Sequence, residues 1–119
     1  MRIGCFSIAM VAGLCLSAGG VMADASNVID WSPRVTVKVG EQVVLHGIRG
    51  ERCGTLPGKN RLKTRFLKTG KIAYGKPGVR ESRSCGGLTP ALEVIFTATA
   101  PGREVITLSG DQITVTVTP

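Results

Sequence analysis

The chain has 119 residues, and its 15 Lys and Arg against eight Asp and Glu give a formal net charge of +7. This length corresponds to one domain, whose stability is marginal without an added crosslink. The single histidine has no cluster of cysteines or carboxylates around it, which argues against a metal site or a catalytic triad.

The first 23 residues have the features of a secretory signal peptide. A positive start at Arg2 precedes the nearly uncharged, apolar stretch Ile3–Leu16, and Val21–Ala23 supplies small or branched residues for a signal peptidase. Glycines and serines interrupt the apolar residues before they reach the roughly 20 that a transmembrane helix needs. We predict cleavage after Ala23, export to the periplasm or the medium, no transmembrane anchor, and a mature domain of residues 24–119.

The four cysteines divide between the leader and the mature chain. Cys5 and Cys15 leave with the signal peptide, whereas Cys53 and Cys85 remain in an oxidising compartment. We therefore predict a Cys53–Cys85 disulfide. The chain-entropy model gives such a crosslink roughly 3–4 kcal/mol, so its predicted role is structural.

The first predicted strands follow a polar lead-in. Residues 24–33 are mostly polar, and we expect Trp31 to close one end of the core. Arg34–Val39 alternates apolar and polar residues, which indicates a half-buried strand. After a glycine turn, Gln42–Ile48 is a second apolar run, and we interpret His46 within it as a packed or surface strand residue.

The middle of the chain is harder to interpret. Arg61–Phe66 fits a strand by alternation and a helix by the spacing of its apolar residues, and its short length and flanking glycines favour the strand. Lys71–Tyr74 is another short candidate strand. Gly75–Gly78 and Ser82–Gly87 are predicted to be loops because glycine, proline and serine are concentrated there.

The last third gives the clearest pattern. Apolar residues alternate over residues 92–98 and 113–117, and residues 105–108 form a further candidate strand. Turns at Ala100–Gly102 and Ser109–Asp111 separate these strands. Strands at this spacing predict an all-β fold, namely a single antiparallel β-sandwich of about seven short strands that follows a cleaved signal peptide.

Two stretches resemble bacterial immunoglobulin-like domains. They are Val39–Leu45, with the sequence VGEQVVL, and Phe96–Gly102, with the sequence FTATAPG. As in those domains, the end of the chain runs from an apolar strand through a Pro-Gly turn to a second strand, and then through a short turn to a closing strand rich in Val and Thr. The resemblance implies an Ig-like β-sandwich over residues 24–119 and implies little about function.

The same stretches also resemble chagasin-like inhibitors of cysteine peptidases. Those proteins insert an Asn-Pro-Thr loop, a Gly-rich loop and an Arg-Pro-aromatic loop into the peptidase cleft. Here Gly86-Gly87 partly matches the Gly-rich loop. Gly47–Pro57 contains no Asn-Pro-Thr, and Ser109–Gln112 is too short for the third loop and lacks its residues. Inhibition of cysteine peptidases is therefore an alternative function.

The positive charge is concentrated in the segment Arg49–Arg83. Eleven cations against two acids give this segment a local charge of +9, which attracts anionic partners and also suits a solvated surface. Within it, Arg80–Ala91 combines arginines, serine hydroxyls and a glycine pair, a composition suited to anion binding. The candidate ligand-binding residues are Arg49, Arg52, Arg61, Lys63, Arg65, Arg80 and Arg83.

The predicted function is that of an exported, non-catalytic binding or structural module. An anionic glycan, a lipid head group or an acidic protein suits the compartment better than nucleic acid, because stacking sites normally intersperse aromatic residues with cations. We predict no catalytic residue, cofactor or metal, since nucleophile-elbow, zinc-peptidase and phosphate-loop motifs do not occur in the sequence. A structural module of an envelope assembly is a third hypothesis.

Overall fold

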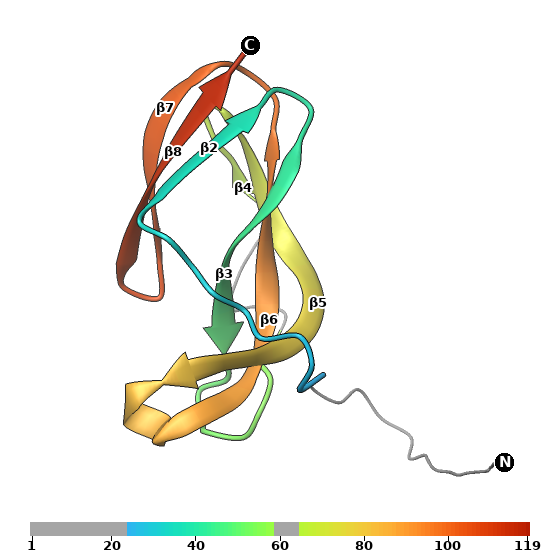
Figure 1. Cartoon of the computed structure of the whole chain (residues 1–119), viewed down its shortest axis with the longest axis vertical. Coiled ribbons are helices and arrows are strands. Elements are labelled where there is room, and N and C mark those ends of the chain that lie inside the picture. The colour runs from blue at the N-terminus through green and yellow to red at the C-terminus, as the bar shows by residue number, and fades with distance from the viewer. Residues whose placement is uncertain (1–23, 59–64) are drawn as a thin grey trace, which may run out of the picture.

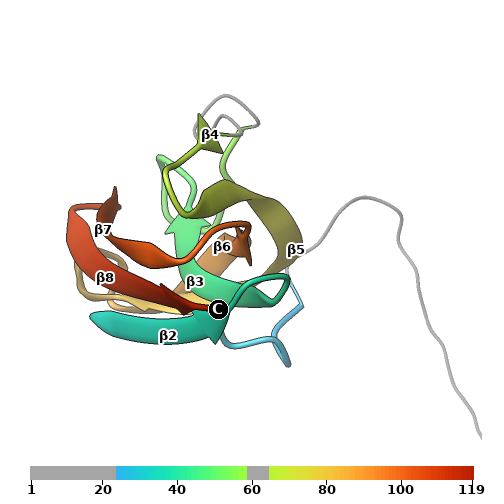
Figure 2. The ribbon, with the colours of Figure 1, turned by 90° about the horizontal axis from the view of Figure 1, so that it is seen from above.

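The computed structural model describes residues 24–58 and 65–119, so the predicted signal peptide lies outside the described residues. The chain forms two β-sheets that are layered as a sandwich (Figures 1 and 2). Within the described ranges the only helical element is a short 3-10 turn, η3 (Arg83–Cys85), and no helix there is long and apolar enough to cross a membrane. The predicted all-β fold is confirmed.

The first sheet has three strands in the order β2-β8-β7. β2 (Arg34–Lys38) runs parallel to β8 (Asp111–Thr118), and β7 (Gly102–Leu108) runs antiparallel to β8. β7 and β8 are joined by Ser109 and Gly110, whose φ angles are 50° and 81°. Positive φ at both positions is typical of the tight hairpin turn whose twist matches its strands.

The second sheet has four antiparallel strands in the order β3-β6-β5-β4. Their bounds are Gln42–Arg49 for β3, Arg65–Phe66 for β4, Gly70–Ser82 for β5 and Gly87–Ala98 for β6. The β5–β6 hairpin continues past the last residue of β3 to the η3 turn (Figure 1). The described residues thus contain seven strands, as predicted, but β5 and β6 are long, with 13 and 12 residues.

The apolar core lies between the sheets and follows the predicted alternation. Leu45 of β3, Ile72 of β5 and Phe96 of β6 are each 0% exposed. Because successive side chains point to opposite faces of a strand, alternate residues of β6 and β8 enter the same interior. These residues are Val94, Phe96, Ala98, Ile113, Val115 and Val117.

The path of β5 corrects one prediction. Gly75–Gly78 is not a loop but part of β5, which contains a bulge between Tyr74 and Pro77. Proline has no N–H to donate to a ladder, so strands tolerate it mainly at edges and bulges. The backbone N–H of Lys76 donates instead to the Glu93 carboxylate at 3.0 Å. The Pro/Gly cluster therefore bends this strand without ending it.

The segment before β2 packs against the second sheet. The Ile29 N–H donates to the Val79 carbonyl at 2.7 Å, and the Val79 N–H donates to the Asn27 carbonyl at 2.9 Å. The side-chain amide of Asn27 also donates to the Glu93 carboxylate at 3.1 Å, and Glu93 is 6% exposed. Hydrogen bonds and the burial of Ile29 therefore fix this polar lead-in to β5 and β6.

Trp31 does not close the core, contrary to expectation. Its side chain is 41% exposed, and its ring stacks on the ring of His46. Ile29 takes the buried position instead and lies against Gly47, whose missing Cβ leaves room for it. The tryptophan therefore covers a polar side chain at the edge of the sandwich.

Candidate functional site

A disulfide fixes the loop that follows β3. Cys53 and Cys85 are joined by an S–S bond of 2.04 Å, which confirms the predicted pairing. Cys53 belongs to the loop after β3, and Cys85 is the last residue of η3. The Gly54 N–H adds a second link by donating to the Thr89 hydroxyl at 2.9 Å. Two segments that are 32 residues apart in sequence are therefore held together.

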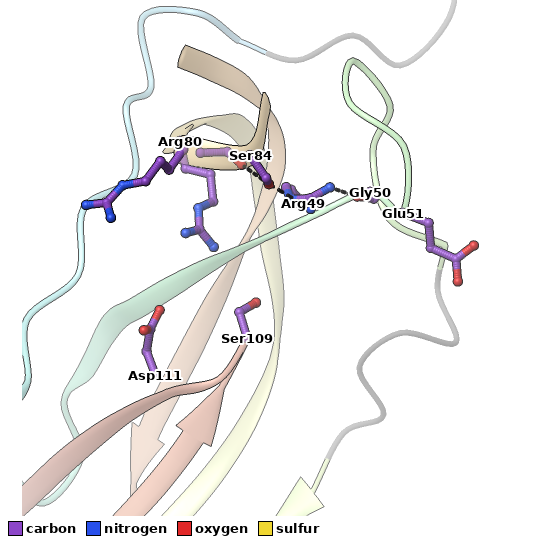
Figure 3. Close-up of a pocket in the computed structure, with 9 residues that line it drawn as sticks. Arg49, Gly50, Glu51, Arg80, Ser84, Ser109 and Asp111 are labelled. Atoms are coloured by element: carbon purple, nitrogen blue, oxygen red, sulfur yellow. Dashed lines mark hydrogen bonds between the residues drawn. The ribbon is translucent and has the colours of Figure 1, made fainter. Parts of the chain in front are cut away.

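An open cleft of about 620 Å³ lies next to these linked segments (Figure 3). Both sheets contribute to its lining, through the end of β3, the end of β5 with η3, and the β7–β8 turn. The lining residues are Arg49, Gly50, Glu51, Arg80, Ser82, Arg83, Ser84, Ser109 and Asp111. All of these side chains except the glycine are charged or carry a hydroxyl group, so the cleft is polar throughout.

Neutral oxygen atoms hold two arginines of the cleft in position. Arg49 donates to the Gly50 carbonyl at 2.9 Å and to the Ser84 hydroxyl at 3.3 Å. Arg80 donates from Nη1 to the Gly47 carbonyl at 2.9 Å. A guanidinium group carries five N–H donors, so each arginine keeps donors for a ligand while its position is fixed.

The positive charge of the cleft is only partly balanced. Arg83 is exposed on η3, and its side chain makes no hydrogen bond or ion pair with the described part of the chain. The Glu51 carboxylate points away from the other labelled side chains (Figure 3). Partial burial lowers the pKa of Arg80, while the charge of Asp111 raises that pKa and the charge of Arg49 lowers it. Arg80 remains protonated, so a bound anion would offset a positive charge that water solvates incompletely.

The opposite wall contains a buried histidine–aspartate pair. The His46 side chain is 1% exposed, and its Nε2 lies 2.8 Å from Oδ2 of Asp111. The Gly47 N–H donates to Nδ1 of His46 at 2.7 Å, so Nδ1 is the acceptor and Nε2 carries the proton. Burial lowers the pKa of His46 against the opposing effect of Asp111, which favours this neutral form.

Trp31 packs against the histidine of this pair, outside the lining of the cleft. Its ring is stacked on His46 with centroids 5.1 Å apart and an interplanar angle of 10°. One feature of the sequence pointed to this arrangement, since a histidine inside an apolar strand needs hydrogen-bonding partners once it is buried. It did not indicate the partner, because Asp111 is 65 residues away in sequence.

The side chains around the cleft differ in which groups they leave available to a ligand. Both ring nitrogens of His46 are engaged, so the imidazole has no free nitrogen to take a proton from a nucleophile. Across residues 24–58 and 65–119, no group of three or more His, Cys, Asp or Glu side chains could hold a metal ion. What the cleft offers is guanidinium and hydroxyl donors, together with the carboxylate of Asp111.

The fold divides the residues predicted to bind a ligand. Arg49, Arg80 and Arg83 line one cleft, whereas Arg52 lies on the exposed loop nearby and does not line it. Arg65 begins β4, which pairs with the first residues of β5 and so lies far from Arg80 near the other end of that strand. The two remaining candidates, Arg61 and Lys63, lie outside the described residues.

Comparisons of the chain with protein-family models, with curated proteins and with solved structures find no match.

Proposed function

We propose that this protein is an exported, non-catalytic binding module that holds an anionic ligand in the cleft formed by Arg49, Arg80 and Arg83. The convergence of these three arginines supports the proposal, because Arg49 at the end of β3 and the neighbouring Arg80 and Arg83 of the β5–η3 segment line one opening. Guanidinium groups bind carboxylate, sulfate and phosphate through paired, charge-assisted hydrogen bonds. Here two of the three are already oriented by bonds to the protein, which reduces the entropy lost on binding.

Export is part of this proposal. A disulfide is typical of secreted and periplasmic proteins, and Cys53–Cys85 supports that location together with the signal-like residues 1–23. Peptide mapping of the exported protein should find Asp24 as the first residue. A chain that retains residues 1–23 after fractionation would contradict the predicted cleavage.

The strand order supports an immunoglobulin-like interpretation of the sandwich. In immunoglobulin domains the second, fifth and fourth strands are neighbours in one sheet, and the last two strands pair in the other. Here β3, β6 and β5 are neighbours in that order, and β7 pairs with β8. Two strands depart from the pattern: β2, the first strand, pairs with β8 and not with β3, and β4, the third strand, pairs with β5, whereas the immunoglobulin third strand lies in the opposite sheet. Such a fold presents binding residues on the loops at its ends.

The alternative of cysteine-peptidase inhibition receives less support. Ser109 and Gly110 are the only residues between β7 and β8, so this connection is a tight turn and not a loop that could enter a peptidase cleft. Its test is an assay against a papain-type peptidase, in which micromolar protein should leave the activity unchanged.

Binding of the exported, oxidised protein to acidic glycans and to anionic lipid vesicles across a salt series tests the main proposal. Arg83→Ala is the most informative variant, because this side chain makes no bond that the described fold depends on. Hydrogen bonds to charged groups contribute about 1.5–3 kcal/mol, so affinity should fall roughly 10- to 100-fold.

Arg103→Ala is the matched control for that experiment. It removes the same charge from an exposed site at the start of β7, and the cleft lies beyond the other end of this strand. If both variants lose the same affinity, binding responds to net charge alone. If every probe binds weakly and salt abolishes the binding, the cleft is only a solvated surface.

A further inference from the structure

The carboxylate of Asp111 lines the arginine cleft, and this restricts the ligands that the cleft can accept. A carboxylate repels inorganic sulfate or phosphate and accepts hydrogen bonds without donating any. A cleft for a simple anion gains nothing from such a group. The ligand that suits this lining therefore carries hydroxyl or N–H donors close to its negative charge.

The position of Asp111 leaves one of its oxygens available. Oδ2 is bound to Nε2 of the buried His46 at 2.8 Å, and Oδ1 makes no hydrogen bond among the described residues. The Asp111 side chain is 33% exposed, and Figure 3 shows its carboxylate and the Ser109 hydroxyl pointing toward the arginine side of the cleft. His46 thus holds the carboxylate in one orientation with an acceptor directed at the opening.

The rest of the lining selects against apolar ligands. Ser82, Ser84 and Ser109 contribute hydroxyl groups, which can both donate and accept. No aliphatic or aromatic side chain lines the cleft, so polar contacts predominate over those that an acyl chain or a hydrophobic peptide side chain would need. Its volume of about 620 Å³ falls within the range of small-molecule sites, so a ligand of one or two sugar rings is of suitable size.

We propose that the cleft binds an acidic sugar unit. The carboxylate or sulfate group of the sugar lies on the guanidinium groups of Arg49 and Arg83, and a ring hydroxyl donates to Oδ1 of Asp111. This inference rests on the proposed function and adds the class of ligand to it. The glycan, rather than an anionic lipid, is favoured because charged and hydroxyl side chains make up the lining and most of its area is polar.

The test measures NMR chemical-shift titrations of the full exported protein with four probes. They are glucuronate, cyclohexanecarboxylate, sulfate and glucose. Cyclohexanecarboxylate keeps a six-membered ring and the carboxylate but lacks every hydroxyl, and glucose keeps the hydroxyls but lacks the charge. We expect glucuronate to bind at least about tenfold more tightly than cyclohexanecarboxylate or glucose, because the loss of a hydrogen bond to a charged group lowers affinity by about that factor.

Asp111→Asn separates the role of this residue from its bond to His46. The amide oxygen can still accept from Nε2 of His46, and the NH₂ group then faces the cleft as a donor. Glucuronate affinity should fall about tenfold while sulfate affinity rises, since a repulsive charge has been removed. Arg83→Ala should weaken both, and the thermal unfolding of each variant shows whether it is folded.

The possible outcomes distinguish the two proposals. If glucuronate and cyclohexanecarboxylate bind equally to the unmodified protein, the acidic-sugar inference is overturned and the anion site stands. If anionic phospholipid vesicles bind more tightly than an acidic oligosaccharide, a lipid head group replaces the sugar as the ligand. If none of the anions produces a saturable shift at the cleft, the proposed function fails together with the inference. The comparison among probes needs no variant, so it remains decisive even if Asp111→Asn does not fold.

Discussion

The interior of the sandwich and the arginine-lined cleft belong to the same small fold but are held together in different ways. In the interior, side chains such as Phe96 and Ile113 are 0% exposed and contact one another without polar groups. In the cleft, a disulfide, backbone carbonyls and the His46–Asp111 pair fix the side chains. Burial of apolar area stabilises the interior, whereas specific bonds set the geometry of the cleft.

This difference implies that the two regions can be perturbed separately. A change in the interior should lower the free energy of unfolding and leave the ligand preference of the folded molecules unchanged. A change in the cleft should alter binding more than it alters stability. The following variants test that separation, from the largest expected effect to the smallest.

Phe96→Ala should have the largest effect on stability. Phe96 is fully buried between the sheets, so the substitution removes apolar contacts and leaves a cavity. Such changes cost about 3–5 kcal/mol, measured as the free energy of unfolding in urea. Val105→Ala is the control, because Val105 is 57% exposed on β7 and should change stability by only about 0.5 kcal/mol or less. Similar losses for both would show that the apolar interior is not what stabilises the fold.

Removal of the disulfide by Cys53→Ala with Cys85→Ala should come next. The loop that it closes spans 32 residues, for which the loss is about 3–4 kcal/mol. Binding to the cleft should also weaken, because the loop after β3 is no longer tied to η3. Near-native stability together with unchanged binding would mean that the remaining hydrogen bonds suffice to hold the loop.

Asp111→Ala should have a smaller effect on stability. It leaves the buried Nε2–H of His46 without its partner, a loss of about 1–3 kcal/mol in the free energy of unfolding. Asp111→Asn should lower the free energy of unfolding less, because its amide oxygen can accept the same hydrogen bond. Asp30→Ala, at an exposed site before β2, serves as the charge-matched control. If Asp111→Ala changes the free energy of unfolding no more than the control does, the His46–Asp111 hydrogen bond does not stabilise the fold.

The smallest effect should be a dependence of stability on pH. Burial lowers the pKa of His46 below its ordinary value of 6.5, so just below pH 6.5 the unfolded chain binds a proton that the folded chain does not. Stability should therefore be constant above this range and should fall as the pH drops below it. The effect is small because the bond to Asp111 opposes the effect of burial. Unfolding in urea at several values between pH 5 and 8 measures it, and His46→Gln should remove this contribution.

The sequence predicted the interior well because alternation is a local property. The period of two along residues 92–98 and 113–117 identifies the buried face without knowledge of the partner strand. The structure confirms it for residues 94–98 and 113–117, whereas Leu92 is only half-buried and Glu93, predicted to lie on the other face, is 6% exposed. The disulfide was also predictable, since only Cys53 and Cys85 lie outside the predicted leader. Gly75–Gly78 was misread because a Pro/Gly cluster usually marks a turn. Here the strand continues through a bulge, and the Glu93 carboxylate accepts a hydrogen bond from the backbone N–H of Lys76 in it.

The cleft was only partly predictable because it depends on contacts between distant segments. The high local charge singled out Arg49, Arg80 and Arg83 along with four other cations, but charge density along the chain does not show which of them share an opening. Asp111 and its bond to His46 were missed, because strand order and sheet packing bring together residues that are 65 positions apart. Trp31 was expected to close the core because it lies close to the start of a predicted strand, whereas Ile29 occupies the buried position.

The direction of β8 bears on how this protein can be attached to a support. The strand begins at Asp111 in the cleft and ends at Thr118, seven residues further on, so its two ends are roughly 23 Å apart. A probe, bead or fused domain coupled after Pro119 would thus be remote from the ligand opening and leave it facing outward. Coupling through Asp24 would instead load the segment that contains Trp31, close to His46. C-terminal immobilisation is therefore the orientation suited to surface-based binding measurements.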